Sequence, residues 1–304
     1  MQTQLDLAAA LHAQAWALAP GALSSLSALA ERGGLGASVR RPAAAAPRNI
    51  SRNRTDSRTA LIEVCGPIQQ HRGLFESFGI GVSCDTIASQ LRAALADPGI
   101  TRVVLEFDTP GGSVFGISEL AAEIRAARGI KPIIGIADST AASAGYWLLS
   151  QCTEAYCAPS GQVGSIGVIA AHEDISGSLE IQGIRITTIC AGAFKDELSP
   201  FAPLNAGARS AMQSMVNSYG GDFTRAVAQG RGVSVDAVRR SMGEGRMLRP
   251  ADALRANMID GICTRDDLLA NRARPATRNG AGAYGGLPPA LARAMRELDL
   301  AELS

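Results

Sequence analysis

Short runs rich in β-branched residues alternate with stretches of helical spacing through the middle of the chain. Five such runs, bounded by Gly, Pro or Asp, predict strands at 60–64, 102–107, 133–137, 166–170 and 184–189. Apolar residues recurring every three or four positions predict helices at 84–96, 114–127, 141–150 and 205–229. This alternation predicts an α/β fold with a largely parallel sheet covered on both faces, and an active site in loops at the carboxyl ends of its strands.

Both ends of the chain lack this alternation. Residues 1–32 predict two short amphipathic helices, and residues 33–58, rich in Gly, Pro, Ala and Arg, predict a linker. Residues 266–304 predict a second linker followed by an amphipathic helix. Residues 7–30 carry no charged side chain, but their Ala, Ser and Pro content argues against a membrane anchor. We therefore expect a central domain over 59–265 with helical appendages that serve docking or assembly.

Composition narrows the classes of function. The 304 residues are 46% hydrophobic and 19% charged with a net charge of +1, which excludes wholesale disorder and gives no basic field for nucleic acid. Six cysteines without CxxC spacing and three histidines provide no metal-site spacing, so we expect neither a metal nor a cofactor. We expect reduced, mostly buried thiols in a cytoplasmic protein; a Cys152–Cys157 disulfide is the less favoured alternative.

Two loops carry small residues at points where chemistry is expected. In loop 108–113, Gly111 and Gly112 can leave backbone N–H groups free for an anion or oxyanion, although on this motif alone a tight turn with positive φ is the favoured explanation. A nucleotide P-loop is excluded because no Gly-Lys-Ser/Thr follows. In loop 138–147, Ser143 lies among Ala and Gly near a predicted helix start, which resembles a nucleophile on a sharp turn. Helix capping explains Ser139 but not Ser143, one turn further inside.

A serine nucleophile needs a base, and two kinds remain open. Of 29 basic residues, only Lys131 and Lys195 are lysines, and a lysine, unlike an arginine, can lose its proton to act as a base. GC-rich coding would explain this preference for arginine equally well. Lys195 lies in loop 191–201, where four neighbours could form apolar walls that lower the pKa of a lysine amine: Phe194, Leu198, Pro200 and Phe201.

The three histidines and Lys131 lie in parts of the sequence that favour a catalytic role less than the loop around Lys195 does. Among His12, His71 and His172, only His172 could be recruited as a histidine base, because His12 lies in the N-terminal appendage and His71 in a Gly-rich loop. Lys131 precedes Pro132 outside any motif and is expected to be a surface charge.

Four ordered motifs together resemble the S49 family of serine peptidases, which includes signal peptide peptidase A and phage head maturation proteases of the capsid protein C type. The motifs are PGG after one strand, AASAGYW after the next, VGSIGV at 163–168 and FKDELSPF at 194–201. The resemblance spans roughly 58–265 and implies a ClpP/crotonase-like β-β-α superhelix with a Ser–Lys dyad.

Site roles follow from the resemblance by motif. It implies Ser143 as nucleophile, Lys195 as general base and Ser165 as the residue that orients the lysine. Gly112, or Gly111, and the N–H of Ala144 would form the oxyanion hole. Ala144 departs from the Gly that is common in relatives, which is tolerated if its φ is negative.

The family has membrane-bound and phage-type branches, and the N-terminal segment of this chain decides which branch we favour. Without a convincing anchor, we favour a phage-type capsid maturation peptidase of the bacterial host cytoplasm, associated with the prohead, that cleaves scaffold or portal-associated proteins. We expect a homo-oligomer with helix 205–229 at the interface. The alternatives are a signal-peptide-peptidase-like enzyme that degrades membrane-released peptides, a crotonase-type acyl-CoA enzyme, and a non-catalytic capsid assembly factor.

Overall fold

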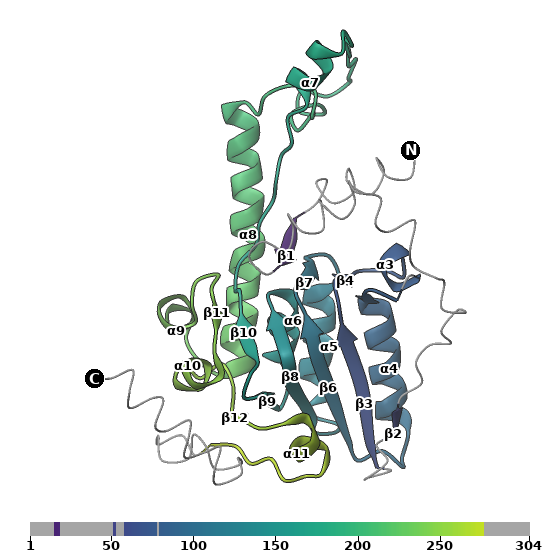
Figure 1. Cartoon of the computed structure of the whole chain (residues 1–304), viewed down its shortest axis with the longest axis vertical. Coiled ribbons are helices and arrows are strands. Elements are labelled where there is room, and N and C mark those ends of the chain that lie inside the picture. Colours follow the sequence, from purple (N-terminus) through teal and green to yellow (C-terminus); the bar gives the residue numbers. More distant parts are fainter. Residues whose placement is uncertain (1–14, 19–50, 53–57, 78, 277–304) are drawn as a thin grey trace.

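A mixed, mainly parallel sheet forms the centre of the molecule. The computed structural model describes residues 15–18, 51–52, 58–77 and 79–276. The sheet has the order β11-β10-β8-β6-β3-β2, with β9 beside β8 and β12 beside β9 (Figure 1). Strands β3, β6, β8, β9 and β10 run parallel. The strands of this sheet are β2 (Ser51–Arg52), β3 (Thr59–Cys65), β6 (Arg102–Thr109), β8 (Ile133–Ala142), β9 (Glu154–Cys157), β10 (Gln162–Gly164), β11 (Met247–Leu248) and β12 (Gly261–Ile262).

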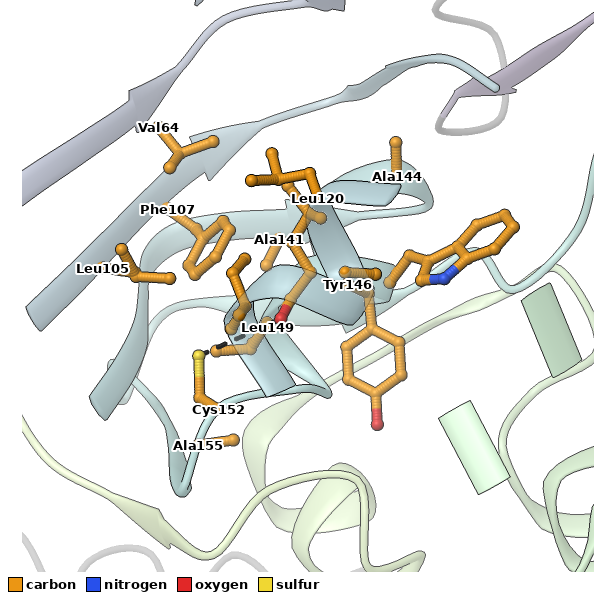
Figure 2. Packing of buried hydrophobic residues seen from close by; sticks show 14 of the residues in the cluster. Val64, Leu105, Phe107, Leu120, Ala141, Ala144, Tyr146, Leu149, Cys152 and Ala155 are labelled. Atoms are coloured by element: carbon orange, nitrogen blue, oxygen red, sulfur yellow. Dashed lines mark hydrogen bonds between the residues drawn. The ribbon is translucent and has the colours of Figure 1, made fainter. Parts of the chain in front are cut away.

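Side chains alternate between the two faces of this sheet, and both faces are covered. On one face, Val64, Leu105 and Phe107 pack with Leu120, Tyr146 and Leu149 from helices α5 (Ile117–Ala127) and α6 (Ala144–Leu149) (Figure 2). Helix α4 (Cys84–Ala96) joins the same layer. On the opposite face, the intervening strand residues pack against Leu268 and Leu269 of α11 (Arg265–Leu269). The predicted α/β class with a covered parallel sheet is confirmed.

A second, smaller sheet lies beside the carboxyl ends of the main strands. It has the order β1-β7-β4-β5. Its strands are β1 (Trp16–Leu18), β4 (Ile68–Gln69), β5 (Val82–Ser83) and β7 (Gly111–Ser113). Two expectations are corrected here: the double glycine lies in a short strand rather than in a strand-to-helix turn, and residues 16–18 are a buried strand rather than part of a helix. The remaining residues of the expected N-terminal helices lie outside the described residues.

Residues 171–204, named the arm below, extend from the body beside the long helix α8 (Ala206–Arg231) and carry the short helix α7 (Ser176–Ile181) (Figure 1). The strands predicted at 166–170 and 184–189 are both wrong. The strand in the first region is β10, a few residues earlier, and only Ile169 forms an isolated β-bridge, with Trp16. Residues 184–189 are extended and exposed without strand pairing.

The apolar face of α8 is only partly in the core. Phe223 and Val227 are fully buried, whereas Met215 is 36% exposed and three further residues of this face are intermediate: Met212, Val216 and Tyr219. The C-terminal half of the helix packs on the body and the N-terminal half leaves it to support the arm (Figure 1). The remaining helices are α3 (Leu74–Ser77), α9 (Val235–Ser241) and α10 (Pro250–Arg255).

The packed unit reaches beyond the expected domain borders at both ends. Strand β2 pairs with β3, although it lies in the expected linker 33–58. Helix α11 begins at Arg265 and buries its leucines, so packing continues past residue 265. The expected amphipathic helix near the C-terminus lies outside the described residues.

Candidate active site

Three parallel strands end at the same edge of the sheet and bring three of the predicted motifs together. Strand β6 leads into the PGG segment, β8 into Ser143 and β10 into Ser165. The register between β8 and β10 pairs Ala142 with Gly164, so the two serines follow directly from paired positions. This placement agrees with the rule that sites on such sheets form at the carboxyl ends of the strands.

Ser143 occupies a sharp turn between β8 and α6. Its backbone has φ 52° and ψ −113°, a conformation that is uncommon for a residue other than glycine. Its N–H donates to the Gly164 carbonyl at 2.7 Å, and its Oγ donates to the Gly167 carbonyl at 3.3 Å. The predicted helix starts at Ala144 rather than at 141, so Ser143 lies on the turn itself, and its exposed fraction is 0%.

The two glycines of the PGG motif are required by close backbone packing. Gly111 has φ +104°, and a β-carbon there would lie 2.1 Å from the Ala17 carbonyl oxygen. A β-carbon on Gly112 would lie 2.0 Å from the Ile68 carbonyl oxygen. The positive φ that the sequence suggested is therefore present at Gly111. Thr109 holds the segment in place by accepting from the Gly111 N–H at 3.1 Å.

Ala144 fits the site in spite of its methyl group. It is the first residue of α6, with helical backbone and a fully buried side chain. As an N-terminal helical residue its N–H has no intrahelical partner, which leaves the group available to an oxyanion. The next residue cannot be enlarged in the same way, because a β-carbon on Gly145 would lie 2.4 Å from the Thr109 Cγ2.

Ser165 resembles Ser143 in its backbone. It has φ 56°, is 4% exposed, and its N–H donates to the Arg246 carbonyl at 2.9 Å. Its Oγ donates to the Leu18 carbonyl at 3.1 Å. Sequence reasoning missed this contact, since nothing in the spacing connects Leu18 with a motif some 147 residues further on.

Lys195 lies on the arm and is exposed within one chain. Among the described residues, it shares no hydrogen bond with Ser143, whose hydroxyl bonds to Gly167 instead. The expected apolar walls are open as well: Phe194 is 77% exposed and Leu198 46% exposed. A single copy of the chain therefore brings Ser143, Ser165 and the glycines together and leaves Lys195 apart from them.

Neither of the described histidines forms a hydrogen bond with Ser143 that would make it the base in place of Lys195. His172 is on the arm, where its Nε2 lies 3.0 Å from the Ser199 carbonyl oxygen. His71 pairs with Asp85 at 3.0 Å on the surface. His12 lies outside the described residues.

Lys131 has a structural role that the sequence did not suggest. Its Nζ donates to the Ala94 carbonyl at 2.8 Å and to the Asp97 carbonyl at 2.6 Å, and it is partly buried. A cation that binds the last carbonyls of a helix stabilises the end of that helix, here α4. The expectation of a plain surface charge is corrected.

The cysteines are all free, and the less favoured Cys152–Cys157 disulfide is absent. Cys65 and Cys190 are exposed, and burial raises the pKa of each of the other four thiols to about 12: Cys84, Cys152, Cys157 and Cys263. Thiols with such pKa values are poor nucleophiles at neutral pH. Among the described residues, no three His, Cys, Asp or Glu side chains gather where they could hold a metal ion.

Comparison with known proteins gives the family. The model of Peptidase family S49 matches residues 125–277, and the chain belongs to this family of serine peptidases. The match includes Ser143, Ser165 and Lys195.

Two phage proteins and a bacterial protease illustrate the relationship. The Head-tail preconnector protein GP5 of Enterobacteria phage P21 is 30% identical over 232 residues, which are 76% of this chain and 45% of that protein. The Capsid assembly protease C of Escherichia phage lambda is 28% identical over 223 residues, 73% of this chain and 50% of that protein. Protease 4 of Salmonella typhi is 29% identical over 193 residues, 63% of this chain and 31% of that protein. The chain spans about half the length of the two phage relatives. No helix in the described part of the chain is long and apolar enough to cross a bilayer.

Proposed function

We propose that the protein is a serine endopeptidase in which Ser143 is the nucleophile and Lys195 the general base. The observation that carries this proposal is the strained turn at Ser143, held at the meeting point of three strand ends and followed directly by the first N–H of helix α6. The main sheet and its helices are consistent with the ClpP/crotonase-like superhelix that the family implies.

The geometry supports an acyl-transfer sequence. A neutral amine takes the Ser143 proton while the Oγ attacks the peptide carbonyl, and the N–H groups of Ala144 and Gly112 bind the developing oxyanion. Of the two glycines first expected to do this, Gly111 is set aside because its N–H already donates to Thr109 Oγ1. The protonated amine then gives its proton to the leaving nitrogen, and water releases the acyl group by the same steps in reverse order. Ser165, next to the β10 end, is suited to hold the amine in position.

Lys195 is best supplied by a second copy of the chain. Within one chain the arm presents several large apolar side chains to solvent, including Ile181 at 89% exposure and Ile189 at 95%. So many large exposed apolar side chains on one short segment favour an interface. Packing of the arm onto a neighbour would cover these side chains and would shield the lysine amine, which a neutral base needs.

The biological role follows the phage relatives. The names of two of them refer to capsid assembly and to a head-tail preconnector. We propose a head maturation peptidase of the host cytoplasm that acts on scaffold or portal-associated proteins.

The test combines a fluorophosphonate probe, which labels activated serines, with cleavage of an unfolded protein followed by mass analysis of the new termini. We expect one labelled peptide that contains Ser143, and loss of label and cleavage in Ser143→Ala. Ser139→Ala is the matched control, because this nearby hydroxyl is exposed and bonds to Asp108. Labelling that survives in Ser143→Ala would contradict the proposal, as would a wild-type protein that neither reacts nor cleaves.

A further inference from the structure

The N-terminal strand β1 fills a slot beside the proposed site. Trp16 donates its N–H to the Ile169 carbonyl and accepts from the Ile169 N–H, both at 2.9 Å. Because the main-chain groups of successive strand residues point in opposite directions, Ala15 and Ala17 face β7 instead. The Val114 N–H accordingly donates to the Ala15 carbonyl at 3.4 Å, and Ala17 is paired with Gly112.

In this slot, β1 contacts residues that we propose for catalysis. The Leu18 carbonyl accepts from Ser165 Oγ, so the serine proposed to position the lysine is bound to β1. A β-carbon on Gly111 would lie 2.1 Å from the Ala17 carbonyl oxygen and 3.1 Å from the Ala142 carbonyl oxygen. Strand β1 therefore lies between the PGG segment of β7 and the residues that follow β10.

The site is closed, and β1 covers the Ser165 side of it. Ser143 is 0% exposed and Ser165 is 4% exposed, so no polypeptide can reach either hydroxyl in this arrangement. Extended peptides bind proteins by adding a strand to an open edge. Here β1 takes the free edge of β7 on one side and the main-chain groups of Ile169 on the other.

We propose that this slot is the binding site for an extended peptide and that Trp16–Leu18 is an internal peptide which must leave before a substrate strand enters. The inference rests on the proposed function and adds a ligand class to it. Ala17 is completely buried beside the glycines and Trp16 is 1% exposed. The slot therefore suits a small residue at the position of Ala17, preceded by a large apolar residue. An incoming strand offers the same backbone hydrogen bonds as β1, so it can replace β1, which has the advantage of being tethered to the slot.

The test locks β1 in the full-length chain. Trp16 and Ser113 lie opposite each other in the register, and Trp16 directs its main-chain groups to Ile169, so the pair is of the closer, non-hydrogen-bonded type that a disulfide can bridge. The variant is Trp16→Cys with Ser113→Cys in a Ser143→Ala background, which prevents cleavage. The probe is a fluorescein-labelled peptide with the sequence of residues 14–20, and its binding is followed by anisotropy.

We expect the oxidised, bridged protein to bind the peptide at least about tenfold more weakly than the same sample after reduction. The two variants that carry only one of the added cysteines, Trp16→Cys or Ser113→Cys, serve as controls and should show no change on reduction. Equal binding in the bridged and reduced forms, or no binding to the reduced form, would overturn the inference. The same sample is compared before and after reduction, so a loss of fold would affect both states.

A second variant tests the same point without a disulfide. Ala17→Pro removes the N–H that faces β7 and should loosen β1, raising peptide affinity roughly tenfold, whereas Ala17→Ser keeps that N–H and should leave affinity unchanged. Affinity in Ala17→Pro at or below the level of Ala17→Ser would count against the inference. Binding is measured without cleavage, so the two proposals can fail separately. If redox-dependent binding occurs but the wild type cleaves nothing, the slot stands and the peptidase function falls.

Discussion

At the scale of single residues, the site depends on two serines in backbone conformations that side chains rarely adopt. Ser143 and Ser165 both have φ values above 50°. Such residues cost about 1–3 kcal/mol each and persist only where their surroundings hold them. The Gly164 carbonyl holds the Ser143 N–H and the Arg246 carbonyl holds the Ser165 N–H. Their shared strain is consistent with a site rather than with ordinary turns.

The two lysines provide a sharp test of the dyad. Lys195→Arg keeps a positive charge but cannot yield a neutral base, so we expect peptide cleavage to fall by at least about 10³-fold with folding intact. The measurement is the initial rate of cleavage of an unfolded substrate, with circular dichroism to check the fold. Lys131→Arg is the matched control, since an arginine can still bind the α4 carbonyls and activity should be retained. A fully active Lys195→Arg protein would end the assignment of this residue as the base.

The sequence was sufficient to single out Ser143 as the candidate nucleophile, but not to predict the arrangement of the residues around it. Ser143 stands out because small residues surround one hydroxyl where a strand passes into a helix. The contact between Ser165 and Leu18 depends on pairing between segments far apart in the chain, which no local pattern encodes. Lys195 lies on an exposed arm away from Ser143, and nothing in the local sequence pattern around FKDELSPF indicates that separation.

At the scale of elements, α8 has two halves with different roles. Its C-terminal half is fixed to the helix that follows the nucleophile: Phe223 stacks on Trp147 with ring centroids 4.5 Å apart, and Gln151 donates to the Ala226 carbonyl at 3.0 Å. Arg231 forms two hydrogen bonds of 2.8 Å with Asp260 at the end of the helix. The helix therefore connects the arm mechanically to the site.

The anchor at Arg231 should matter for stability. Its side chain is only 7% exposed, and Arg231→Met would remove both bonds to Asp260 and the bond to the Asn257 carbonyl. We expect the free energy of unfolding to fall by about 2 kcal/mol, seen as a lower urea midpoint at unchanged slope. Arg225→Met, which removes an exposed pair with Asp222 on the same helix, should cost less than about 0.5 kcal/mol. Equal losses in the two variants would show that the buried pair contributes no more than the exposed one.

Elements were predictable where local signals and packing agree. Helix α4 has the predicted bounds because Ser83 caps it, accepting from the Thr86 N–H, and its apolar residues face the core. Strand β8 runs to Ala142, five residues beyond its predicted end at 137, because its second half leaves the β9 pairing and pairs with β10. The apolar residues at 184–189 resemble a strand, but they lie on the exposed arm and do not pair.

At the scale of the whole molecule, the arm places part of the proposed chemistry at a distance from the rest (Figure 1). The body holds Ser143 and the glycines, and the arm holds Lys195 among exposed apolar side chains such as Phe194. Closed symmetric assemblies are the usual result when one surface of a protomer fits a different surface of the next. A ring of this kind would complete each site with a lysine from the neighbouring copy.

Mixing two inactive variants tests this arrangement. If Ser143→Ala and Lys195→Arg proteins are unfolded together and refolded into mixed assemblies, about a quarter of the sites should combine an intact serine with an intact lysine. Activity should return to about that fraction of the wild-type value, measured per protomer. Each variant refolded alone is the control and should remain inactive. Sites formed within a single chain would give no recovery at any mixing ratio.

Strand β8 pairs with β9 along its first half and with β10 along its second half, and this change of partner affects how the chain tolerates insertions. The short turn between β9 and β10 sets the level at which β10 meets the second half of β8, and Gly161 in that turn packs against the Ser139 carbonyl, where a β-carbon would lie 2.8 Å away. One extra residue there would slide β10 by a single position and turn Ser165 to the opposite side of the sheet. Length is thus fixed within the few residues that lead into β10.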